Sequence, residues 1–199
     1  MERWKRLTLI GAVAMLVGLV ACASADTGRE NPAEQTTSTT ATTAAAGIEA
    51  HNNADVWFVR RMIPYHQQEI EMSDILLGKQ GVDPRVTDLA IAIKATRVPE
   101  LEQMQNWLYQ WDVIHPPEDG GMVGQLTERE LGVLSEAQGA DASRLFLTQM
   151  IAHHDGAISL AQAEIEEGQF SPAVAMARAI AGTQQQQVDT MKGILTALQ

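Results

Sequence analysis

The sequence predicts an all-α domain, a four-helix bundle made of two repeated helix hairpins. After residue 50 the chain is rich in Ala, Leu, Met, Gln and Glu, which favour helices, and it has few alternating β-branched runs. Glycines, prolines and capping residues divide this region into four long segments. One short phrase of residues also occurs twice, which indicates that a single supersecondary unit was duplicated.

The first hairpin is expected to consist of two helices joined by a short turn. Residues 55–77 are predicted to form the first helix, which ends at Gly78. Residues 83–111 are predicted to form the second, with Asp83 as the N-cap and Pro84 at the first helical position. A short turn favours an antiparallel arrangement of the two helices.

The second hairpin follows a longer connection over residues 112–124, which is rich in proline and glycine. Residues 127–130 have the pattern of a capping box, which predicts a short helix after the connection. Asp141 is expected to cap the third long helix, which reaches about residue 167. The fourth is expected to run from Ser171 to the C-terminus.

Two prolines lie inside the predicted helices, where each costs a backbone hydrogen bond. Pro64 aligns with Ala152 in the second copy of the repeat, so the first helix is expected to continue through Pro64 with a kink. Pro99 is open to two interpretations, a continuous helix or a break in the second helix.

The repeated phrase is built from residue types that bind metals. Its first copy holds Phe58, Met62, Ile63, His66 and Ile70, and its second holds Phe146, Met150, Ile151, His154 and Ile158. A further methionine follows each copy at a similar distance, Met104 after the first and Met191 after the second. A thioether and an imidazole one helical turn apart form a soft donor pair that suits copper, especially Cu(I).

The repeated residues share a helix face with other polar side chains. In the first helix this face also holds Asp55 and Glu69, and in the third it holds His153 and Glu164. The partner helices carry Arg97, Glu100 and Met104, and Gln184, Gln187 and Met191, at the same spacing. Buried polar groups need partners. We therefore expect the bundle to have a polar interior, with His66 and His154 facing it.

The N-terminal residues are typical of a bacterial lipoprotein. Residues 1–22 have a basic start and a short apolar stretch, and they end in Leu-Val-Ala-Cys, which resembles a lipobox with Cys22 as the lipidated residue. An ordinary signal peptide is the other interpretation. Residues 23–50 are mostly Thr, Ala and Ser and predict a disordered tether. The helical domain over residues 51–199 would then sit on the extracytoplasmic face of the cell membrane, held by the lipid anchor alone.

Composition excludes several other functions. The chain has a net charge of −11, which disfavours nucleic acid as a partner. Its one cysteine rules out an internal disulfide and, once lipidated, a zinc–thiolate site or thiol catalysis. A homo-oligomer stays open, as do the metal's identity and the physiological partner.

These residues resemble the domain of unknown function 305 family, which is found in many secreted bacterial proteins. The match covers about residues 50–199. It rests on Asp55, Phe58, Met62, Ile63, His66, Ile70, Glu100, Leu101, Met104, Trp107 and Trp111 in the first half, and on Phe146, Met150, Ile151, His153, His154, Ala157, Ile158, Gln184, Gln187, Val188 and Met191 in the second. The resemblance implies a ferritin-like four-helix bundle, an extracytoplasmic location and, in some members, copper binding or tolerance. Tyr65 departs from the family's histidine, and Arg97 from its glutamine.

Three classes of function fit the sequence. The first is a lipoprotein that binds copper for handling or tolerance, and the second is a structural or interaction module without metal. The third, a di-metal oxidase, needs Glu-x-x-His on two helices, whereas this chain has only His66-x-x-Glu69, in reversed order. The candidate metal ligands are His66, His153, His154, Met62, Met150, Met104, Met191, Glu69 and Asp55.

Overall fold

The structure is a computed structural model that describes residues 50–113 and 122–198. The leader, Cys22 and nearly all of the proposed tether lie outside the described residues, as does most of the connection between the two hairpins. Among the helices that the structure describes, none is long and apolar enough to cross a membrane.

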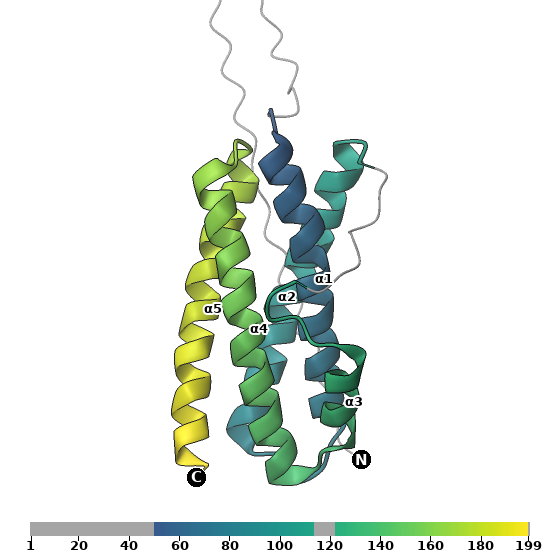
Figure 1. Ribbon diagram of the computed structural model, residues 1–199, viewed down its shortest axis with the longest axis vertical. Helices are drawn as coiled ribbons and strands as arrows, with labels where there is room; N and C mark the ends of the chain where they lie inside the picture. Colours follow the sequence, from purple (N-terminus) through teal and green to yellow (C-terminus); the bar gives the residue numbers. More distant parts are fainter. Residues whose placement is uncertain (1–49, 114–121, 199) are drawn as a thin grey trace, which may run out of the picture. The chain divides into compact units, whose positions relative to one another are not determined.

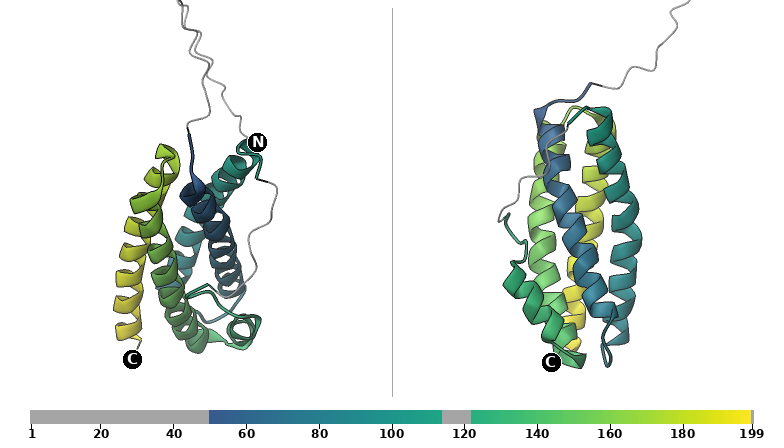
Figure 2. Two further views of the ribbon diagram at one scale, coloured as in Figure 1. Left: turned by 45° about the horizontal axis from the view of Figure 1, so that its top comes forward. Right: turned by 90° about the vertical axis from the view of Figure 1, so that its right-hand side faces the viewer.

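The described residues form helices and no strands (Figure 1). The helices are α1 (Asn53–Leu77), α2 (Pro84–Gln110), α3 (Glu128–Glu136), α4 (Gly139–Glu167) and α5 (Ser171–Ala197). Helix α1 pairs with α2 and α4 with α5, and the two hairpins meet mainly where α1 packs against α4 (Figure 2). The predicted bundle of two helix hairpins is therefore confirmed, while the narrower ferritin-like assignment stays a prediction.

Local side-chain chemistry sets where the helices begin. Asn52 caps α1, with Asp55 completing a capping box, and Thr127 opens α3 through the predicted capping box. The prediction of Asp141 as the cap of α4 is wrong, because the helix begins at Gly139 and Asp141 lies in its first turn. Gly139 has φ +53°, a left-handed conformation that glycine adopts without strain.

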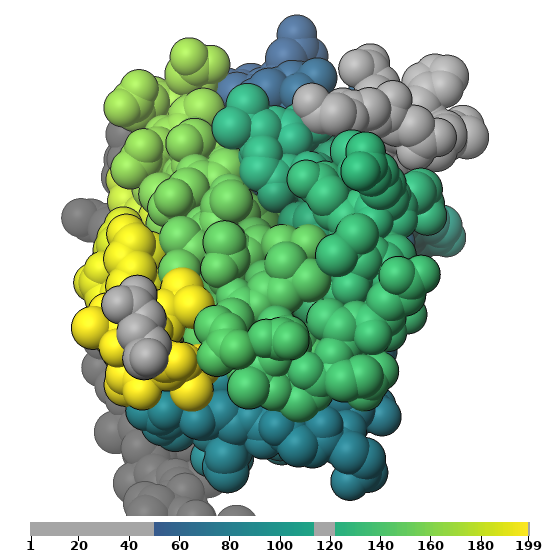
Figure 3. Space-filling model, turned by 60° about the horizontal axis from the view of Figure 1, so that its bottom comes forward, coloured from purple at the N-terminus to yellow at the C-terminus, as the bar shows by residue number. Residues whose placement is uncertain are grey.

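Helix α3 covers the side of the bundle where α1 and α4 meet. It contacts both helices, and Gln149 on α4 donates to the backbone carbonyl of Glu130 at 3.2 Å. In the space-filling view α3 and α4 form one continuous surface (Figure 3). The short helix therefore belongs to the bundle rather than to a separate connection.

Both internal prolines lie in uninterrupted helices, Pro64 in α1 and Pro99 in α2. A break at Pro99 is therefore excluded. A proline inside a helix costs about 3 kcal/mol. Buried residues on both sides of Pro99, such as Ile93 and Met104, anchor α2 in the core and offset that cost.

The apolar core consists of two clusters separated by polar side chains. The Phe58 cluster includes Phe58, Met62, Met104, Trp107, Ala157, Phe170 and Ile180, and the Met72 cluster includes Met72, Leu76, Ile93, Phe146, Met150, Val188 and Met191. Between them along the four long helices lie His66 and Glu69, then Arg97, then His153 and His154, then Gln184 and Gln187, all buried. We call these residues, with Glu100, the polar layer.

Two polar contacts at matched positions of the repeat join the hairpins. Asp55, near the start of α1, accepts backbone N–H bonds from Gln169 at 3.0 Å and Phe170 at 2.9 Å, just before α5. Ser143, near the start of α4, accepts the N–H of Asp83 at 3.0 Å, just before α2. The first helix of each hairpin thus stabilises the start of the other hairpin's second helix.

Candidate metal centre

Glu69 lies at the middle of the polar layer and joins the two hairpins. Its side chain is fully buried, and it accepts a hydrogen bond on each oxygen. Arg97 Nε on α2 donates to Oε2 at 2.5 Å, and Gln184 Nε2 on α5 donates to Oε1 at 2.9 Å. These donors occupy matched positions of the two repeats, so one carboxylate serves both halves.

Arg97 is also fully buried, and acceptors surround its guanidinium group. Besides Glu69 it donates to Glu100 Oε2 at 2.9 Å and to Gln187 Oε1 at 3.1 Å. Burial opposes its charge, but the two carboxylates outweigh that effect and raise the pKa of Arg97. Arg97 is therefore a fixed positive charge inside the bundle.

His66 and His154 make the same kind of contact in their two hairpins. His66 Nε2 lies 2.9 Å from Glu100 Oε2, and His154 Nε2 lies 2.9 Å from Gln187 Oε1. Both oxygens also accept a hydrogen bond from Arg97, so each Nε2 carries the proton and donates it. In a neutral imidazole the lone pair is then on Nδ1, and the Nδ1 atoms of both histidines are buried without a hydrogen-bond partner.

His153 has no hydrogen-bond partner on either ring nitrogen, although it is fully buried. Its Nδ1 lies 3.8 Å from Glu69 Oε1, which makes an electrostatic contact but exceeds hydrogen-bond distance. Tyr65, at the matched position of the first copy, contacts the ring edge-on with centroids 5.0 Å apart. Neither ring nitrogen of His153 is therefore engaged, and in the neutral imidazole one of them offers a lone pair.

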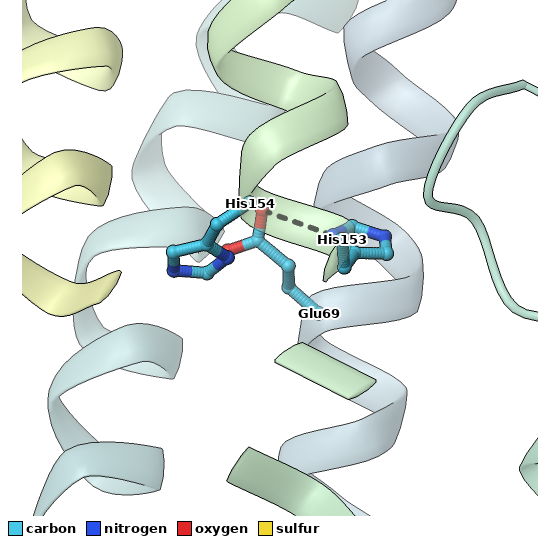
Figure 4. Close-up of side chains that lie close together, drawn as sticks. All are labelled: Glu69, His153 and His154. Atoms are coloured by element: carbon cyan, nitrogen blue, oxygen red, sulfur yellow. Dashed lines mark ion pairs between the residues drawn. The ribbon is translucent and has the colours of Figure 1, made fainter. Parts of the chain in front are cut away.

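Glu69, His153 and His154 converge on one small volume. Each offers a ligand atom, and these atoms lie within 4.8 Å of one another. Figure 4 shows the carboxylate of Glu69 between the two imidazoles. Ligand atoms around a tetrahedral ion lie about 3–4 Å apart when metal–nitrogen bonds are about 2.0–2.1 Å. Small side-chain rotations would bring these atoms to that separation, so the residues fit a metal ion.

The charge states of the group also favour a metal ion. Burial lowers the pKa of His153 to about 4 and also lowers that of His154. Burial alone would raise the pKa of Glu69, but Arg97 and the three histidines lower it to about 2. At neutral pH the imidazoles are therefore uncharged and the carboxylate is ionised, which are the forms that bind metal.

The other residues that the sequence singled out occupy different places. His66 is buried in the polar layer but lies outside the group of Glu69, His153 and His154. The four methionines are fully buried, Met62 and Met104 in the Phe58 cluster, Met150 and Met191 in the Met72 cluster.

Asp55 is not brought to the group. It lies about 20 Å from Glu69 along α1, at about 1.5 Å per residue. Its oxygens accept three backbone N–H bonds, from Asn52, Gln169 and Phe170. The geometry therefore gives Asp55 a structural role at the end of the bundle.

Sequence reasoning missed the parts played by Arg97, Gln184 and Gln187. Their shared spacing placed them on the inner face of the partner helices. It did not reveal that Arg97 and Gln184 bind Glu69 from both sides, or that Gln187 fixes the tautomer of His154. Only the packing of four helices sets which side chains meet.

Fold and site together define a class of protein, a four-helix bundle with a candidate His/Glu metal site in its core. The sequence matches the model of the domain of unknown function family DUF305 over residues 55–195. The chain belongs to the DUF305 family, as its residues predicted. Among curated proteins, none matches the sequence.

Solved structures of DUF305 proteins have the same fold. A DUF305 protein from Streptomyces coelicolor is 28% identical, with a TM-score of 0.68, over 73% of this chain and 92% of that one. A DUF305 fragment from Deinococcus radiodurans is also 28% identical, with a TM-score of 0.66, over 73% and 97% of the two chains. CopM in its Cu(I)-bound form is 26% identical, with a TM-score of 0.61, over 72% and 96%. Silver-bound and Cu(II)-bound forms of CopM are similar as well.

Proposed function

We propose that the protein is an extracytoplasmic lipoprotein that binds a soft transition-metal ion, copper above all, for handling or tolerance. The metal would be held by Glu69, His153 and His154 inside the bundle. One observation carries the proposal: His153 and His154 have buried ring nitrogens without a hydrogen-bond partner, and one nitrogen of each lies within 4.8 Å of a carboxylate oxygen of Glu69.

Unpartnered buried polar atoms are costly. Burying a polar group without a partner costs about 1–3 kcal/mol in proteins, so native interiors contain few of them. Of those in the described residues, the atoms on His66, His153, His154 and Gln184 lie in the polar layer. A bound ion would use one lone pair of His153 and one of His154 and so offset part of that cost.

The surroundings of His154 match those of a metal-binding histidine. Such histidines donate their second ring N–H to a carboxylate or carbonyl oxygen, which fixes the tautomer and the ring orientation. His154 donates to Gln187, and Gln187 is itself held by Arg97. This arrangement leaves Nδ1 of His154 unprotonated and available to a metal.

Copper is favoured by the neighbouring thioethers and by the relatives. Met150 lies one helical turn before His154, and thioether with imidazole suits Cu(I). CopM, a protein of the same fold, has been solved with Cu(I), silver and Cu(II). The group holds a single carboxylate, whereas a di-iron site takes a Glu from each of its four helices, so a holding role fits better than di-metal oxidase chemistry.

The metal proposal is tested by titrating the purified protein with Cu(I) against a chromophoric chelator, alongside elemental analysis after exposure to copper, zinc and iron. A double His153→Ala, His154→Ala variant should lose Cu(I) binding. His51→Ala is the matched control, because His51 stacks on Trp111 at 4.5 Å, away from the group. Equal uptake by all three proteins would exclude the site.

The location is a separate part of the proposal and depends on Cys22 at the end of the leader. A Cys22→Ala variant should be released into the medium or accumulate as an uncleaved precursor. If the unaltered protein is already found without a lipid and begins at another residue, the anchor is excluded while the metal site is unaffected.

A structural module without metal is the second candidate. Its support is the ion-pair network of Glu69, Arg97 and Glu100, in which every carboxylate and the guanidinium already have partners. That network gives partners to the buried charges of the first hairpin but leaves Nδ1 of His66 and both nitrogens of His153 unpartnered. A protein that binds none of the tested metals and keeps full stability without them would favour this candidate.

A further inference from the structure

The polar layer holds an uneven set of charges. Arg97 forms ion pairs with both Glu69 and Glu100, so two carboxylates share one buried guanidinium. The formal charge of these three side chains together is −1. A singly charged ion beside them would balance that charge, whereas a doubly charged ion would leave a net positive charge inside the bundle.

All three charges come from the first hairpin. At the positions matched to Arg97 and Glu100, the second hairpin has the neutral residues Gln184 and Gln187. Both pairs hold a histidine at 2.9 Å from their second member, and Arg97 donates to the oxygen that does so in each pair. The one buried cation of the polar layer therefore reaches across to the uncharged hairpin.

Arg97 is placed to act on the metal group directly. Its Nε donates to Glu69 Oε2, on the carboxylate that the group would use as a ligand. Another of its nitrogens donates to Gln187 Oε1, the atom that orients His154. The positive charge thus lies beside Glu69 and reaches His154 through Gln187.

We infer that Arg97 is a built-in cation that makes the centre select singly charged soft ions, such as Cu(I) and Ag(I), over doubly charged ions such as Zn(II) and Cu(II). The inference rests on the proposed function and adds the charge of the ion to it. Repulsion between Arg97 and a dication is twice that between Arg97 and a monocation at the same place. Arg97 therefore acts as a specificity-determining residue without being a ligand.

The size of the effect follows from Coulomb's law. At about 6 Å and an effective dielectric constant of about 20, the repulsion between two unit charges changes an affinity by about 100-fold, and water near the layer reduces this. Replacing Arg97 with a neutral residue should therefore shift selectivity toward dications by about 10- to 100-fold. The same replacement should lower the Cu(II)/Cu(I) midpoint potential by about 60–120 mV, at 59 mV per tenfold change for one electron.

The experiment measures Ag(I) and Zn(II) affinities, which avoid copper redox chemistry, for the unaltered protein and for variants of opposite charge. Arg97→Gln should lower the Ag(I)/Zn(II) affinity ratio by about 10- to 100-fold. Glu100→Gln should raise the ratio, because loss of a negative charge weakens a dication more than a monocation. The change should be smaller than that of Arg97→Gln, because 21% of the Glu100 side chain is exposed and water screens its charge. The double variant, which gives the first hairpin the glutamine pair of the second, should return the ratio toward that of the unaltered protein.

Arg97→Lys is the matched control, because it keeps the charge but loses the planar guanidinium. It should keep the Ag(I)/Zn(II) affinity ratio even if it destabilises the fold. A ratio as low as that of Arg97→Gln would mean that the geometry of the guanidinium, and not its charge, sets the selectivity. Glu100→Gln keeps the Glu69–Arg97 pair, so it tests the charge effect even if Arg97→Gln does not fold. Unchanged ratios in Arg97→Gln and Glu100→Gln would overturn the inference.

Failure of the proposed function looks different. In that case the unaltered protein binds neither Ag(I) nor Zn(II), and no ratio exists to compare. Tight binding by the unaltered protein with a ratio that no charge variant changes would retain the metal site and reject only the role of Arg97. Midpoint potentials of the copper-loaded proteins give an independent readout of the same charge.

Discussion

The two hairpins share one framework but divide its chemistry between them. In each, a histidine on the first helix is held at 2.9 Å by a side chain of the second helix, His66 by Glu100 and His154 by Gln187. The α1–α2 hairpin adds a buried ion pair between Glu69 and Arg97. The α4–α5 hairpin is uncharged in the polar layer and supplies both imidazoles of the candidate metal group. The comparison shows that repeated backbone geometry does not require repeated electrostatics.

The largest expected effect comes from removing the buried positive charge of the α1–α2 hairpin. Arg97→Met should destabilise the protein by about 3–5 kcal/mol, because it leaves buried carboxylates without their cation. The matched change on the other hairpin, Gln184→Met, should cost only about 1–3 kcal/mol, the price of one lost neutral partner to Glu69. Urea unfolding followed by circular dichroism measures both. Equal losses would show that the charge on Arg97 contributes nothing to stability.

The next effect tests which half supplies the ligands. His153→Ala and His154→Ala should each weaken Cu(I) binding by more than about 100-fold, beyond the loss that outer partners of metal ligands cause. His66→Ala should weaken it by less than about tenfold, because His66 lies outside the group. Competition with a chromophoric chelator gives the three affinities. A loss for His66→Ala as large as the others would place the metal in both halves.

A third test uses a buried acid that the second copy has and the first lacks. Glu164 on α4 matches Leu76 on α1, and both are almost fully buried. Burial and the nearby carboxylate of Asp55 raise the pKa of Glu164 to about 8, above its ordinary value of 4.5.

The unfolded chain therefore releases the Glu164 proton at lower pH than the folded protein, so this residue's stabilising effect is complete below about pH 4.5 and is lost as pH rises toward 8. The loss is at most about 1.4 kcal/mol per pH unit. Glu164→Gln should remove this slope and make the protein more stable than the unaltered chain at pH 8. Urea midpoints between pH 5 and pH 8.5 measure it, and parallel curves would contradict the raised pKa.

The smallest effect concerns Tyr65, the residue matched to His153. Its hydroxyl donates to the backbone carbonyl of Val123 at 2.6 Å and so holds the segment before α3 against α1. Tyr65→Phe should cost about 0.5–1.5 kcal/mol of stability, the value of one hydrogen bond, and leave Cu(I) affinity unchanged. Thermal unfolding and the chelator assay check the two outcomes. A drop in copper affinity would make Tyr65 part of the centre.

Much of this architecture could be predicted from the sequence, because it depends on local rules. Helical periodicity, the capping box at Thr127 and the proline after Ser171 gave the helices and their order. The repeat predicted that His66 and His154 would be buried, and both are. The start of α4 was misjudged because Asp141 is a good cap in sequence, whereas Gly139 allows the chain to enter the helix one turn earlier.

The candidate site was harder to predict from the sequence, because it depends on contacts between helices. A helical wheel assigns Glu69 and Asp55 to the same face. It does not show which residues of the neighbouring helices lie at the same level along the bundle. In the structure Glu69 meets the imidazoles of α4, while Asp55 meets the backbone before α5. The methionines drew attention by their repetition, yet repetition alone does not separate core packing from metal binding.

The contact between Tyr65 and His153 has an evolutionary consequence. Equivalent residues of two copies can touch only near the axis that relates the copies, so in an ancestral dimer of identical hairpins each would have met its own twin. Any substitution in such a dimer would have changed both sides at once. A single polypeptide that carries both copies is free of that constraint. Each partner could then mutate alone, and the pair could become a phenol against an imidazole.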